Sequence, residues 1–182
     1  MSASPKPESA SPTPDWRPFV VLPDGARSPG ARRLGGPDGV GDRLRIAAFA
    51  ELQARQAFAW GARSFPDAPE ELRAVWTELA AQEDKHLGWL LARMEVLGVA
   101  PGGRPVSDHL FRGLLDCTTA HAFAWTMAKA EERGRVAGEA FAAALHGIDP
   151  TSASLFGQIA AEEADHIELA LRFFPESDRG RP

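Results

Sequence analysis

The sequence predicts an all-α fold, an up-and-down four-helix bundle preceded by a disordered or draped N-terminal arm. Long stretches carry apolar residues at intervals of three and four, the period of a helix that buries one face. Pro- and Gly-containing segments interrupt these stretches, and no segment alternates apolar and polar residues as a half-buried strand does. Short connections between long amphipathic helices favour antiparallel neighbours, hence the up-and-down arrangement.

Four helices are expected, and helix-breaking residues set their ends. The first spans 42–65 and is closed by the two prolines of "SFPDAPE". The second spans about 69–97 and ends at Gly98, a residue type typical of helix C-termini. The third runs from Ser107, a candidate N-cap, to Leu145, and the fourth covers about 151–174 and stops before Pro175.

Composition divides the chain into three parts. Residues 1–41 are dense in Pro, Ser and Gly, which argues against any regular helix, so we assign them to the arm. Within the arm, "WRPFVVL" at 16–22 is apolar enough to pin it to the body. Residues 42–176 form the bundle, and residues 177–182 form a flexible tail.

The bulk properties restrict the class of protein. A length of 182 residues and 44% apolar residues suit one domain with a sizeable core. The formal net charge of −5 argues against a dedicated nucleic-acid binder, which needs a basic surface. The single cysteine, Cys117, fits a reducing compartment. Since neither a signal segment nor a membrane-spanning run is visible, we expect a cytoplasmic protein that makes no membrane contact.

Two helix faces that should be buried carry the same pair of polar residues. Glu83 and His86 lie three residues apart on a face that also carries Trp76, Leu79, Leu87 and Leu90. The fourth helix repeats the spacing with Glu163 and His166. Burying an unpaired charge costs roughly several kcal/mol, so these side chains need partners inside the bundle.

Each remaining helix offers an acid for the same interior. The first contributes Glu51, which shares a face with Leu44 and Phe58. The third offers Glu131 and Glu132, and helical phase places Glu132 on the apolar face. One Glu from each of two helices, with Glu-x-x-His from each of the other two, is the ligand set of di-iron and di-manganese carboxylate proteins. The competing interpretation is a bundle whose carboxylates stay protonated or pair with nearby basic residues: Arg55, Lys129 or Arg133.

The ordered motifs resemble the ferritin-like superfamily, and within it an uncharacterised bacterial rubrerythrin-like family, a domain of unknown function. The resemblance covers 32–174, through "RRLGGPDG", Glu51, "EDKH" at 83–86, "LG" at 97–98, "EERG" at 131–134 and "EEADH" at 162–166. The E-x-R-G motif favours Glu131 over Glu132 as the ligand. There are departures: Arg45 and Phe49 stand where family members tend to carry histidines, and Gln82 replaces an acid.

The motifs and the resemblance together imply two iron ions, with manganese or a mixed Fe/Mn pair as the alternative. The ligands would be Glu51, Glu83, His86, Glu131 or Glu132, Glu163 and His166, with Glu83 and Glu163 bridging the ions. The first functional hypothesis is an oxidase or oxygenase that activates O₂ or peroxide towards a small-molecule substrate. Because relatives include tRNA-modifying hydroxylases, a tRNA base stays among the substrate classes.

The alternative is a non-enzymatic or protective metal-binding protein that scavenges peroxide, oxidises ferrous iron or handles metal. A third hypothesis is a cargo protein of a larger assembly, with residues 1–41 as its interaction tail. The sequence leaves open whether the protein is an enzyme, and it is compatible with a homodimer.

Overall fold

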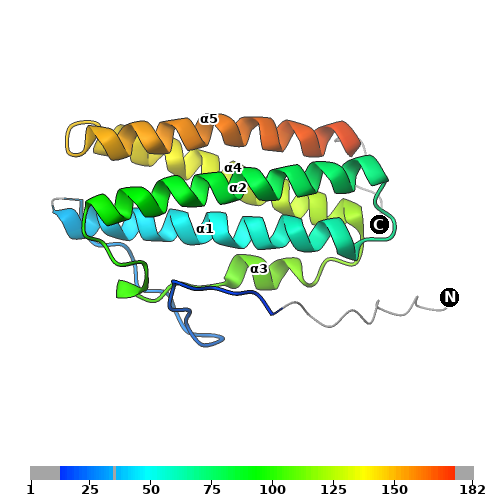
Figure 1. Cartoon of the computed structure of the whole chain (residues 1–182), viewed down its shortest axis with the longest axis horizontal. Helices are drawn as coiled ribbons and strands as arrows, with labels where there is room; N and C mark the ends of the chain where they lie inside the picture. Colours follow the sequence, from blue (N-terminus) through cyan, green and yellow to red (C-terminus); the bar gives the residue numbers. More distant parts are fainter. Residues whose placement is uncertain (1–12, 35, 175–182) are drawn as a thin grey trace.

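The computed structural model describes residues 13–34 and 36–174, and within these ranges the fold is an all-α bundle, as predicted (Figure 1). The four long helices are α1 (Pro37–Ser64), α2 (Glu70–Val96), α4 (Ala120–Leu145) and α5 (Pro150–Phe173). A 3₁₀ turn, η1 (Pro101–Gly103), and a short helix, α3 (His109–Leu114), lie between α2 and α4. The expected tail at 177–182 lies outside the described residues, as do residues 1–12 of the arm.

Neighbouring long helices run antiparallel around the bundle. Arg93 near the end of α2 pairs with Asp149 just before α5, and Arg172 near the end of α5 pairs with Glu71 at the start of α2. Along the chain, however, the directions do not alternate strictly. The connection between α2 and α4 travels the length of the bundle by way of α3, so α2 and α4 run in the same direction (Figure 1).

The expected single helix over 107–145 is wrong, because the chain breaks between α3 and α4. The Thr119 side chain caps α4 by accepting a hydrogen bond from the backbone N–H of Ala122, at 3.1 Å. The Asp67 carboxylate accepts a second one from the N–H of Ala120, at 2.9 Å. Both bonds satisfy first-turn donors, so α4 begins as a separate helix beside the α1–α2 turn.

The first helix begins at Pro37, inside the segment expected to hold no regular helix. Proline suits the first turn, where its missing N–H has no partner to lose. The glycines that argued against a helix permit close packing instead. A Cβ on Gly39 would lie 2.0 Å from the Arg33 carbonyl oxygen, and one on Gly41 would lie 2.8 Å from a methyl carbon of Val99.

The described part of the arm packs on the bundle, as the 16–22 pattern predicts. The Trp16 ring contacts the rings of Phe49 and Phe111 edge-on, each at a centroid distance of 5.3 Å. Phe19 is buried, and its ring centroid lies 5.2 Å from that of Phe49. Two backbone hydrogen bonds, both to Val106, fix the following residues in an isolated bridge.

The core consists of two apolar clusters at opposite ends of the bundle. One is built around Leu44, Phe49, Leu90, Met94 and Phe156, and the other around Phe58, Leu72, Trp76, Phe123 and Met127. The candidate metal ligands of the sequence analysis, except Glu132, lie between these clusters. No helix in the described part of the chain combines the length and apolar character needed to cross a bilayer.

Candidate metal centre

Six ionisable side chains from all four long helices meet halfway along the bundle. Every one of them is buried, with an exposed fraction of 9% or less. α1 supplies Glu51, α2 supplies Glu83 and His86, α4 supplies Glu131, and α5 supplies Glu163 and His166. Helical spacing brings each Glu-x-x-His pair to one face, and bundle packing turns both faces inward.

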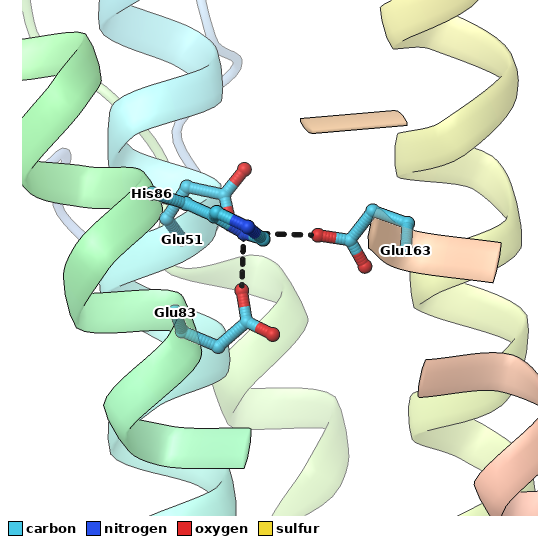
Figure 2. A group of neighbouring side chains, drawn as sticks. All are labelled: Glu51, Glu83, His86 and Glu163. Carbon is cyan, nitrogen blue, oxygen red and sulfur yellow. Dashed lines mark ion pairs between the residues drawn. The ribbon is translucent and has the colours of Figure 1, made fainter. Parts of the chain in front are cut away.

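The first group of side chains is centred on the His86 ring (Figure 2). Its Nδ1 atom lies 3.7 Å from a carboxylate oxygen of Glu51, 3.7 Å from one of Glu83 and 3.5 Å from one of Glu163. Figure 2 shows Glu163 reaching across from α5 towards a ring held by α2. One donor atom from each of these residues lies within 4.8 Å of the others, a spacing that could hold a metal ion.

The second group pairs the same two bridging candidates with residues of α4 and α5. It contains Glu83, Glu131, Glu163 and His166, again with donor atoms within 4.8 Å of one another. The Nδ1 atom of His166 lies 2.9 Å from Glu83 Oε1 and 3.4 Å from Glu163 Oε2. Glu83 and Glu163 therefore belong to both groups, and the two imidazole rings stack with centroids 5.9 Å apart.

The outward nitrogen of each histidine is anchored by a side chain of another helix. His86 Nε2 lies 2.8 Å from Glu162 Oε2, and His166 Nε2 lies 2.8 Å from Gln82 Oε1. A carboxylate can only accept, so the proton shared with Glu162 belongs to His86 Nε2. This hydrogen bond fixes the ring so that Nδ1 faces the carboxylates, the usual arrangement behind a metal-binding histidine.

The inward-facing atoms have unmet bonding capacity. Among the described residues, both carboxylate oxygens of Glu83, one oxygen of Glu163 and the Nδ1 atoms of both histidines are buried without a hydrogen-bond partner. Although His166 Nδ1 is close to Glu83, the pair does not meet hydrogen-bond geometry. Buried polar atoms are almost always satisfied in native proteins, so a cluster of such exceptions marks a place that could hold a metal ion.

Two of the carboxyl groups favour the neutral form when no metal is bound. Burial raises the pKa of Glu51 and that of Glu131 well above the ordinary value for a glutamate. The negative charges of Glu83 and Glu163 add to the effect. Both groups are therefore harder to ionise than an ordinary glutamate.

The other two carboxyl groups and the histidines form ion pairs. Burial alone would raise the pKa of Glu83 and that of Glu163. At Glu83 the two histidines, His166 and His86, outweigh burial, so its pKa is lowered. At Glu163 the neighbouring Glu131 and both histidines outweigh burial, so its pKa is lowered as well. Burial favours a lower pKa for the histidines, yet the carboxylates raise the pKa of His86 to about 12 and that of His166 to about 9. The positive charges of the two imidazoles therefore balance the negative charges of Glu83 and Glu163.

The comparison with protein-family models matches residues 2–180, nearly the whole chain, to one family. The chain belongs to the family described as "Protein of unknown function (DUF455)". The comparisons with curated proteins and with solved structures gave no match.

In this DUF455 chain, the structure separates the two candidates from the third predicted helix. Glu131 is 7% exposed and belongs to the second group. Glu132 lies on the outer face of α4 and pairs with Arg135 at 2.8 Å, which lowers its pKa. The two departures noted in the first helix are structural: Phe49 packs in the core, and Arg45 donates to the carbonyl oxygens of Ala100 and Pro101.

Sequence reasoning missed the roles of Gln82 and Glu162. Each precedes the glutamate of one Glu-x-x-His pair and binds the histidine of the other pair, so the two anchors are related by approximate twofold symmetry. The repeated spacing could have revealed these roles. The residue just before each glutamate lies beside the facing helix, where it can reach the histidine of that helix. Glu162 also pairs with Lys85 at 2.6 Å. Lys85 and His86 together outweigh the effect of burial and lower the pKa of Glu162 to about 2.

Proposed function

We propose that this protein binds two divalent metal ions, iron or manganese, and uses them in oxidation chemistry with O₂ or peroxide. The observation that carries the proposal is the pair of overlapping donor groups, which share Glu83 and Glu163 and otherwise differ. Glu51 and His86 would hold one ion, Glu131 and His166 would hold the other, and the two shared carboxylates would bridge them. Glu132 takes no part in this assignment.

The residues fit such a pair of ions. Ligand atoms about 2.1 Å from a metal lie roughly 3.0–3.4 Å apart, close to the spacing of the inward-facing donors. Four carboxylates balance the charge of two divalent ions, and the partnerless Nδ1 atoms supply the nitrogen ligands. The directions in which the four long helices run also agree with a ferritin-like fold, in which one long crossover connection is typical.

When bound, the two ions would supply electrons to O₂ or peroxide at coordination positions the protein leaves open. The chain's own residues hold the geometry. Glu162 and Gln82 orient the two imidazoles, and the apolar clusters on either side keep bulk water from the carboxylates. The raised pKa values of Glu51 and Glu131 mean that a metal ion would compete with protons for these carboxyl groups.

An apolar cavity beside the site favours an oxidase or oxygenase over a purely protective protein. The cavity has a volume of about 180 Å³, and Glu51, Glu131 and Glu163 form part of its wall. Scavenging peroxide or oxidising ferrous iron requires no chamber for an organic molecule. The protective role would be favoured if the reduced protein turned over O₂ or peroxide rapidly with no added substrate.

Metal analysis tests the proposal directly. We expect two ions per chain after anaerobic loading with Fe(II) or Mn(II), and an anomalous-scattering map with two peaks among the six side chains. His86→Ala should lose at least one ion per chain, whereas His109→Ala, which alters an exposed histidine on α3, should keep both. The proposal fails if the wild-type chain binds fewer than one ion, or if His86→Ala and His166→Ala bind as much metal as the wild type.

A further inference from the structure

The cavity lies in the seam between the two halves of the bundle. α1 with α2, and α4 with α5, form closely packed hairpins, and the cavity opens where α1 faces α4. Its walls are mostly small or apolar: Ala47 and Ala50 on α1, Gly134 and Ala137 on α4, and Phe156 and Ile159 on α5. Leu110 of α3 contributes to its edge.

The size of the cavity follows from the small residues that line it. Gly134 lies one helical turn after Glu131, so both face the same seam. A Cβ built on Gly134 would meet no atom within 4 Å, so helix packing does not require glycine here. Glycine weakens a helix interior relative to alanine, and its effect at this position is to leave the space open.

The chemistry of the walls selects the ligand. None of the described residues that line the cavity is basic, so an anionic ligand would find no partner. Apart from the three glutamates at one side, the wall is hydrocarbon. A cavity of about 150 Å³ lined by apolar side chains is sufficient to bind benzene, so the volume here suits one six-membered ring or a short alkyl chain.

We propose that this cavity binds an uncharged, apolar small molecule, or the apolar end of one, against Glu51, Glu131 and Glu163. The identification of that molecule as the substrate rests on the proposed function. The binding itself rests on the walls alone. Gly134 determines the room available, so it is a specificity-determining residue.

Fluorobenzene, followed by ¹⁹F NMR, is a suitable probe for the full-length chain, with metal content measured on the same sample. On the metal-free chain we expect fluorobenzene to bind and 4-fluorobenzoate, of similar size but charged, not to bind, since a bound metal ion would itself coordinate the carboxylate of the benzoate. With Mn(II) loaded, the fluorine signal of bound fluorobenzene should relax faster than with the diamagnetic Zn(II), because the cavity adjoins the site.

Gly134→Leu should weaken fluorobenzene binding at least about tenfold by filling the cavity. Gly88→Leu is the matched control: Gly88 is also an exposed helix glycine with nothing within 4 Å of its Cβ, but it lies outside the cavity wall. Ala50→Leu fills the cavity from the opposite wall and should repeat the loss if Gly134→Leu does not fold. Circular dichroism melting checks that each variant is folded.

The inference is overturned if fluorobenzene does not bind the wild type, if 4-fluorobenzoate binds as well, or if the folded Gly134→Leu and Ala50→Leu variants bind fluorobenzene like the wild type. It is also overturned if the wild type is a dimer in light scattering and Gly134→Leu is a monomer, since the seam would then be a contact between copies. Failure of the proposed function is distinct. A chain that binds no metal but loses fluorobenzene with Gly134→Leu refutes the metal centre and retains the cavity site.

Discussion

The charges of six buried ionisable residues can be balanced in two different ways. Without metal, the positive charges of His86 and His166 balance Glu83 and Glu163, while burial favours the protonated form of Glu51 and Glu131. With two divalent ions, four ionised carboxylates would balance the metals and both imidazoles would be neutral. Metal binding should therefore release protons from the cluster, including those of both imidazoles.

This exchange predicts that metal affinity rises steeply with pH. The pKa of His166 is about 9 and that of His86 about 12, so both imidazoles hold a proton at pH 7 that a metal ion must displace. Titrating weakly buffered protein with Mn(II) at pH 7 should release at least about two protons per two ions, and affinity should increase at least about tenfold per pH unit for each ion. Release of one proton or none would show that the imidazoles are already neutral.

The two histidines differ in their outer partners. His86 is anchored by the ionised Glu162 and His166 by the neutral amide of Gln82. A carboxylate makes an imidazole a stronger metal ligand than an amide does. The ion held by His86 should therefore be the more tightly bound of the two.

Glu162→Gln should remove this difference and weaken the tighter site about 10- to 100-fold. Competition with a fluorescent chelator gives the two dissociation constants separately. Asp165→Asn is the matched control, because it also neutralises an exposed acid near the centre of α5, and it should change neither constant measurably. Equal losses in both variants would indicate a general electrostatic effect instead of an effect on His86.

At the scale of elements, one buried aspartate ties the start of α1 to two loops. Asp42 is 2% exposed and accepts from Arg32 at 2.8 Å, from Arg45 at 2.9 Å and from Arg104. These arginines come from the arm, from α1 and from the loop after η1. The hydrogen bonds from Arg32, with the charges of Arg104 and Arg32, lower the pKa of Asp42, even though burial opposes it.

Asp42→Ala should lower the free energy of unfolding by about 3–5 kcal/mol, because it leaves Arg45 buried without its ionic partner. Urea denaturation followed by circular dichroism measures the change. Asp38→Ala is the control: Asp38 also pairs with Arg32, at 2.6 Å, but it is largely exposed, so its loss should cost less than about 1 kcal/mol. Similar costs for both variants would contradict the structural role assigned to Asp42.

Elements also show where sequence reasoning fails. Helical period alone identified Glu51 and both Glu-x-x-His pairs, because their helices are continuous and strongly patterned. The same reasoning favoured Glu132 because it placed this residue in phase with Leu114, Trp125 and Val136. In the structure residues 115–119 form no helix between Leu114 and α4, and Val136 is 50% exposed. Local periodicity also cannot reveal the bond that Asp67, from a distant turn, accepts from the N–H of Ala120 at the start of α4. The motif, which is independent of phase, favoured Glu131, the residue that the structure buries.

At the scale of the whole molecule, the helical periodicity of the sequence predicted the bundle. The path of the connections between its helices depends instead on contacts between residues that are distant in the sequence. The α2–α4 connection runs along the bundle because Val106 bonds the arm and Phe111 packs against Trp16. These contacts join residues about ninety positions apart, beyond the reach of any local pattern. The arm and the crossover segment therefore support each other on one side of α1 (Figure 1).

This mutual support makes the arm a structural part of the fold. Phe19 is 7% exposed and contacts Phe49, whereas the adjacent Val20 is 52% exposed. Phe19→Ala should lower the free energy of unfolding by about 3 kcal/mol, and Val20→Ala by less than about 0.5 kcal/mol. Limited trypsin proteolysis provides a second measurement. Cleavage after Arg27, on an exposed segment, should be fast in both variants. Cleavage after Arg112 should become faster only in Phe19→Ala, because the segment between α2 and α4 is then no longer covered by the arm. If Phe19→Ala is as stable and as resistant as Val20→Ala, the arm lies on the bundle without stabilising it.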